Sequence, residues 1–239
     1  MAALAIAATT TLILVALSHP PLGAAAMSMW QQLARLVAAQ QQAGLVHGVI
    51  IVLLAVLAGA YGVFGTMLGE RRPAVRLASA TYRAGCSLMV LAMLLDGYVT
   101  PQVAAAFIDG PAGDVPFVFL LLRCVGVLIQ VLAKAGFLAM CVACLAWSCA
   151  LLVERPRRPW STACIAAGLL AAALPAGVIL GTSMQLAPAS LMLLFGAHAL
   201  WNLMVALLLH RSSSAAIDHP AAPPAPGHNG AAAPTAAPG

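Results

Sequence analysis

The sequence predicts an all-α fold, a polytopic membrane helix bundle with about six transmembrane helices and both chain ends in the cytoplasm. Hydrophobic residues make up 63% of the 239 and charged residues only 7%, whereas a soluble domain carries about 25% charged residues. The apolar stretches are about 20 residues long, which is enough for a helix to cross a bilayer. They also lack the alternating hydrophobicity of a transmembrane β-barrel.

The cationic residues give the orientation. Most of the 11 Lys and Arg residues lie in or beside three short segments, and short loops rich in Lys and Arg remain in the cytoplasm. They are Arg71, Arg72, Arg76 and Arg83; Arg155, Arg157 and Arg158; and Arg211. We therefore expect residues 1–211 to form a transmembrane domain with spans at about 2–18, 44–68, 77–99, 130–153, 162–181 and 188–210.

The first apolar stretch ends at Ser18-His19-Pro20-Pro21. Small residues at 24–26 make a cleavable signal an alternative, but the stretch lacks a charged n-region and is treated as the first span. Residues 28–43 then place Trp30, Leu33 and Val37 on one helical face and polar residues elsewhere. That pattern predicts a short helix lying in the outer membrane interface.

The loop at 69–73 ends the second span on the cytoplasmic side, and Thr100-Pro101 ends the third on the outer side. The next apolar run, 116–153, is too long for one span, because a single helix would reach about 57 Å against about 30 Å of hydrocarbon. We expect an interfacial helix at about 116–128, a break near Gly126 and the fourth span at about 130–153. Trp160 anchors the start of the fifth span at the interface.

Arg211 marks the cytoplasmic end of the sixth span. Residues 212–239 consist mainly of Ala, Pro, Gly and Ser with almost no bulky apolar residue. A segment of this composition buries too little apolar surface to fold. We therefore expect a disordered cytoplasmic tail.

Ionisable side chains inside membrane spans are costly and point to function or to specific pairing. By depth and helical face, Asp96 and Lys134 come within reach of each other near the outer side, with His19, His47 and Gln130 around them. We expect an outward-facing polar pocket whose charged pair is Asp96–Lys134. The alternative is a buried ion pair that only fixes helix register, with both histidines at headgroup level.

A second interpretation involves metal. His19, His47 and Asp96 are suitable zinc or copper ligands, although their spacing is not diagnostic. Deeper in the membrane, His198 lies one turn from Asn202 and at a depth similar to that of Cys141 and Cys144. A cysteine pair on an apolar helix is more often a packing feature, and no particular cofactor is predicted.

These residues favour a non-enzymatic protein that binds or moves a small solute, an ion or a proton, or that serves as an assembly factor. The alternative is an intramembrane metal or redox protein or an enzyme using His19, His47 and Asp96. The expected partner is the lipid bilayer. Nucleic acid is excluded, because the net charge of +5 is divided among short loops with no aromatic-studded basic face.

The stretch Asp96-Gly97-Tyr98-Val99-Thr100-Pro101, with Leu132-Ala133-Lys134 and Trp147-Ser148, resembles segments of small uncharacterised bacterial multi-pass inner-membrane proteins. The likeness covers the six spans and omits the tail. It implies a location in the bacterial inner membrane and no particular chemistry.

Overall fold

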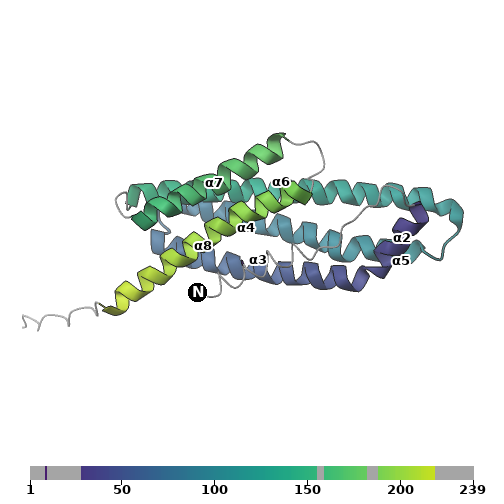
Figure 1. Cartoon of the computed structure of the whole chain (residues 1–239), viewed down its shortest axis with the longest axis horizontal. Coiled ribbons are helices and arrows are strands. Elements are labelled where there is room, and N and C mark those ends of the chain that lie inside the picture. Colours follow the sequence, from purple (N-terminus) through teal and green to yellow (C-terminus); the bar gives the residue numbers. More distant parts are fainter. Residues whose placement is uncertain (1–8, 10–27, 155–158, 182–187, 219–239) are drawn as a thin grey trace, which may run out of the picture.

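The computed structural model describes residues 9, 28–154, 159–181 and 188–218. Their elements, in chain order, are α2 (Met29–Ala38), α3 (Gln40–Leu68), α4 (Pro73–Leu94), a π-helix (Leu95–Val99), α5 (Thr100–Phe107), a 3-10 turn (Ala112–Asp114), α6 (Val115–Glu154), α7 (Pro159–Gly181) and α8 (Pro188–Asp218). No strand occurs in this part of the chain. The predicted all-α bundle is confirmed, and its long helices run side by side (Figure 1).

Within the described residues, five helical segments are long and apolar enough to cross a membrane, as expected of a multi-pass membrane protein. They are Gln40–Leu68, Pro73–Phe107, Val115–Val153, Trp160–Gly181 and Leu193–Arg211. The predicted first span, at 2–18, lies outside the described residues apart from Thr9, which is helical and buried.

Helix α2 begins with a capping box. The Ser28 hydroxyl accepts from the Gln31 backbone N–H, and the Gln31 side chain accepts from the Ser28 N–H, so two otherwise unpaired donors are satisfied. On its buried face, Leu33 packs with Ala104 of α5 and Val118 of α6. The predicted interfacial helix at 28–43 is therefore too long, because α3 begins at Gln40.

The sequence predicted that the third span ends at Thr100-Pro101. The helix instead continues through the π-helix into α5, which ends at Phe107. Pro101 has no N–H to donate to the preceding turn, which would normally break the helix. Here the wider π-turn precedes the proline, and the backbone N–H of Thr100 donates to the carbonyl of Leu95. The Thr100 hydroxyl donates to the same carbonyl at 2.9 Å. The helix therefore passes the proline with a local change of pitch.

The predicted break near Gly126 is wrong, because α6 is one continuous helix of 40 residues, about 60 Å long at 1.5 Å per residue. No proline occurs between 117 and 153, and a single glycine costs a helix only about 1 kcal/mol relative to alanine. The predicted disordered tail also begins too early. Helix α8 continues past Arg211 to Asp218, and the rest of the tail lies outside the described residues.

The core of the bundle is an aromatic cluster formed by Tyr61, Phe64, Tyr82, Trp147 and Trp201, called here the aromatic core. Tyr61 stacks on Trp147 with ring centroids 4.7 Å apart, and Phe64 meets both tryptophans edge-on. Helices α7 and α8 lie beside the half of the bundle away from α2 and α5 (Figure 1). We call the opposite end, formed by α2, α5 and the first turns of α6, the α2–α5 end.

Candidate functional site

An ion pair joins α3 to the π-helix. Its two atoms are His47 Nε2 and Asp96 Oδ2, 3.1 Å apart. The other ring nitrogen, Nδ1, is 2.7 Å from the carbonyl oxygen of Ala43, one turn earlier on α3. The imidazole is only 3% exposed, whereas the Asp96 side chain is 28% exposed. A buried base therefore faces a carboxylate that solvent still reaches.

Glycines make this close approach possible. A Cβ atom at Gly97 would overlap the Cβ of His47, so the π-helix touches α3 only because residue 97 has no side chain. Next to it, Tyr98 lies across Gly44 and Gly48, and its hydroxyl donates to the Gly44 carbonyl at 2.9 Å. Small residues at helix contacts allow such close packing within membranes.

The geometry fixes how many protons the pair holds. A carbonyl oxygen only accepts hydrogen bonds, so Nδ1 of His47 carries a proton that it donates to Ala43. A hydrogen bond between Nε2 and a carboxylate oxygen requires a second proton, on either the imidazole or Asp96. With both hydrogen bonds made, the pair would hold this second proton and carry no net charge. Removal of that proton leaves a lone pair facing a carboxylate, which repel each other.

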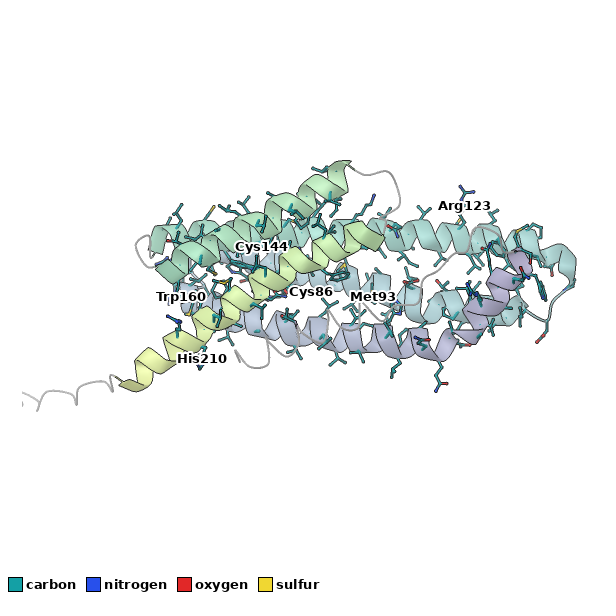
Figure 2. The ribbon with its side chains drawn as sticks, in the orientation of Figure 1. Cys86, Met93, Arg123, Cys144, Trp160 and His210 are labelled. Carbon is teal, nitrogen blue, oxygen red and sulfur yellow. The ribbon has the colours of Figure 1, made fainter. Side chains whose placement is uncertain are left out.

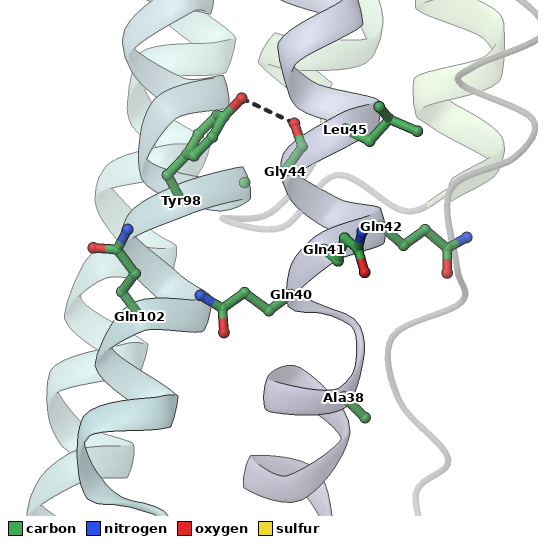
Figure 3. A pocket seen from close by; sticks show the side chains of 9 residues that line it. Ala38, Gln40, Gln41, Gln42, Gly44, Leu45, Tyr98 and Gln102 are labelled. Atoms are coloured by element: carbon green, nitrogen blue, oxygen red, sulfur yellow. Dashed lines mark hydrogen bonds between the residues drawn. The ribbon is translucent and has the colours of Figure 1, made fainter.

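A groove of about 730 Å³ opens beside the pair (Figure 3). It is lined by Ala38, Gln40, Gln41, Gln42, Gly44, Leu45, Gly97, Tyr98 and Gln102. Figure 3 shows Gln40 and Gln102 on the two neighbouring helices that flank the groove. Amide groups both donate and accept hydrogen bonds without carrying charge, so the groove suits a small polar or cationic solute.

The predicted pocket residues are only partly brought together. Asp96 pairs with His47, and the expected pairing of Asp96 with Lys134 stays a prediction. Lys134 and Gln130 are half-buried on α6, and neither lines the groove. His19 lies outside the described residues.

The deeper candidate residues, Asn202 and His198, also have different neighbours. Asn202 accepts a hydrogen bond from the Tyr61 hydroxyl at 2.5 Å, next to the aromatic core. His198 is buried against the Phe137 ring, with centroids 5.6 Å apart, and its Nε2 has no partner in the described part of the chain. The hydrogen bond between Tyr61 and Asn202 was not predicted from the sequence.

The metal interpretations gain no support from the described residues, in which no three His, Cys, Asp or Glu side chains are placed to hold an ion. Cys141 donates to the Ala171 carbonyl at 3.6 Å instead of approaching His198 as a ligand. Cys86 and Cys144 lie within the bundle (Figure 2) and are buried. The set His19, His47 and Asp96 cannot be assembled here because it includes a residue outside the described part.

The residues that line the groove were not predicted as site residues from the sequence. Three consecutive glutamines, at 40–42, precede an apolar span. Tyr98 and Gln102 belong to the neighbouring helical segment and line the same groove. Uncharged amides do not stand out in a search for ionisable groups, although a run of three before a glycine was a usable signal.

Comparison of the chain with protein-family models, with curated proteins and with solved structures finds no match.

Proposed function

We propose that this multi-pass protein resides in the bacterial inner membrane, binds a proton at His47 and Asp96, and exchanges it for a small cationic solute. The cationic loops favour cytoplasmic chain ends, and in that orientation the groove would face outward. The resemblance around residues 96–101 supports the same membrane. The site would thus receive its solute from the periplasm.

The observation that carries the proposal is the hydrogen bond between His47 Nε2 and Asp96 Oδ2. An ionisable residue inside a membrane span costs at least about 2.5–3.5 kcal/mol near the helix centre, and such residues usually mark ion or proton pathways. Histidine is the side chain whose charge changes near physiological pH. A π-turn inside a helix is also frequently found at functional sites.

The exchange follows from charge balance. The loaded pair is neutral, and loss of one proton leaves one net negative charge at Asp96. A cation entering from the groove restores neutrality, because Asp96 is the partner that remains partly exposed. Amide oxygens of the glutamines and the Tyr98 hydroxyl supply polar contacts along the way. Proton and cation would therefore bind in alternation.

Proteoliposomes containing a trapped pH-sensitive dye test the proposal. Gradients of sodium, potassium and ethanolammonium are imposed one at a time, with a proton ionophore as reference. We expect at least one cation to drive proton movement in the wild type and none to do so in Asp96→Asn. The matched control is Asp109→Asn, which removes an exposed carboxylate from a turn outside the site.

Proton movement unaffected by Asp96→Asn would contradict the proposal. So would a wild type in which none of the three cations moves protons while the purified protein remains folded by circular dichroism.

A further inference from the structure

Helix α4 has two opposite faces. The buried face packs on α3 and α6 through residues such as Val75, Tyr82 and Met89. The exposed face follows steps of four and three, and its members are Arg76, Ala80, Arg83, Ser87, Leu91 and Leu94. Residues at this spacing lie on one side of a helix. We call this set the α4 stripe.

The α4 stripe is cationic near the start of the helix and apolar near its end. Its two arginines lie near the start of the helix, small residues follow, and Leu91 and Leu94, which are 49% and 41% exposed, lie near its end. Within the described residues, neither arginine side chain has a hydrogen bond or ion pair. Two unpaired guanidinium groups thus lie on a helix side that faces away from the bundle.

Helix geometry places the two guanidinium groups on the same side of α4. Arg76 and Arg83 are seven residues apart, about 10 Å along the axis. Side chains in a helix point toward its N-terminus, so Arg83 extends back toward Arg76. The long arginine stem lies along the apolar surface while the charged group reaches the interface. Both groups therefore arrive near the level of the lipid phosphates.

We propose that the α4 stripe binds an anionic phospholipid, with Arg76 and Arg83 holding its phosphate and the rest of the stripe contacting an acyl chain. Guanidinium pairs with phosphate oxygens in a bidentate manner, and the bilayer supplies this ligand next to the stripe. Ala80 and Ser87 leave room for a chain that continues to the two leucines. The charge and the apolar surface thus match one molecule, a lipid.

Native mass spectrometry of the purified full chain tests this, with phosphatidylglycerol, phosphatidylcholine and inorganic phosphate as probes. We expect phosphatidylglycerol to bind more tightly than phosphatidylcholine. The double variant Arg76→Gln with Arg83→Gln should lose about thirtyfold in affinity for phosphatidylglycerol, since each arginine near an anionic surface contributes about fivefold. Binding of phosphatidylcholine should change little.

The matched control is Arg35→Gln with Arg123→Gln, which removes two exposed arginines from α2 and α6; Arg123 points away from the bundle in Figure 2. This control should keep wild-type affinity for phosphatidylglycerol. Arg76→Lys with Arg83→Lys keeps both positive charges and should retain part of the affinity for phosphatidylglycerol. This result would show that the Gln variant binds weakly because it lacks charge and not because it is misfolded.

Three outcomes would overturn the lipid site. The first is equal affinity for the two lipids, and the second is unchanged binding in the Gln variant. The third is inorganic phosphate displacing phosphatidylglycerol at equal concentration, which would assign the arginines to a soluble anion.

Discussion

The two ring nitrogens of His47 meet acceptors of different kinds, and this difference gives the residue its chemical role. The Ala43 carbonyl fixes the orientation of the ring and the position of one proton. The contact with Asp96 then determines whether Nε2 is protonated. A carboxylate in this position orients an imidazole through its hydrogen bond.

A double-mutant cycle tests the pairing. We expect His47→Ala and Asp96→Ala each to lower the free energy of unfolding by about 1–3 kcal/mol. The double variant should lose less than the sum, with a coupling of about 1–2 kcal/mol, since either single change leaves a polar group without its partner. Chemical unfolding in detergent micelles provides the measurement.

The comparison cycle is Asp96→Ala with Lys134→Ala, which should be additive to within about 0.5 kcal/mol. Additivity for His47 with Asp96, or strong coupling for Asp96 with Lys134, would contradict the observed pairing.

Gly97→Ala probes the contact beneath the pair. The added methyl group would overlap the Cβ of His47, and overpacking of this kind costs about 1–3 kcal/mol. We expect a lower melting temperature and reduced proton movement in proteoliposomes. Gly59→Ala is the control, because nothing lies within 4 Å of a Cβ at that position of α3. It should be neutral or slightly stabilising, and equal effects of the two changes would contradict the close approach.

At the scale of elements, the sequence predicted helix identity better than helix ends. Hydrophobicity and length located the long helices because lipid demands them. Both mistaken ends, at Thr100-Pro101 and Gly126, came from residues that weaken an isolated helix. Neighbouring helices supply the missing stability in the folded protein, and the π-turn accommodates Pro101. Single-residue break signals are therefore weak evidence inside a packed bundle.

Candidate residues were predicted more reliably than their partners. His47 and Asp96 stood out because charge inside a membrane span is rare and costly. Their pairing could not be read from periodicity, since the rotation and shift of one helix against another depend on contacts such as Gly97 with His47.

Spin labels test the continuity of α6. Phe117 and Val142 are exposed at 61% and 45%, so cysteines there accept labels in a chain whose native cysteines are replaced. Their 25 intervening steps give about 38 Å along a straight helix at 1.5 Å per residue. Electron–electron double resonance should show one distance near this value. A much shorter or broad distribution would indicate a break near Gly126.

At the scale of the whole molecule, the first three candidate spans are much longer than the hydrocarbon layer is thick. They contain 29, 35 and 39 residues, or about 43, 52 and 58 Å at 1.5 Å per residue, against about 30 Å of hydrocarbon. The excess accommodates the α2–α5 end, whose small core contains Leu33, Ala104 and Val118. The His47–Asp96 pair lies between that end and the aromatic core. A solute in the groove would thus be near water while the pair is held by the bundle.

Reporter fusions test the orientation. A green fluorescent protein fused after Arg71 should fluoresce, and alkaline phosphatase fused after Gly110 should be active, because the first site is cytoplasmic and the second periplasmic in the proposed layout. The exchanged fusions serve as controls and should give no signal. Active phosphatase after Arg71 would invert the layout and turn the groove toward the cytoplasm.

Nuclear magnetic resonance of the protein in liposomes tests the central claim, that His47 and Asp96 together hold one shared proton. The ¹⁵N signals of the His47 ring, assigned through His47→Gln, are read at neutral pH together with the ¹³C signal of the Asp96 carboxyl group. We predict a protonated Nδ1 and one further proton, on Nε2 or on Asp96, and an unprotonated Nε2 in Asp96→Asn. An unprotonated Nε2 facing an ionised Asp96 in the wild type would contradict the account.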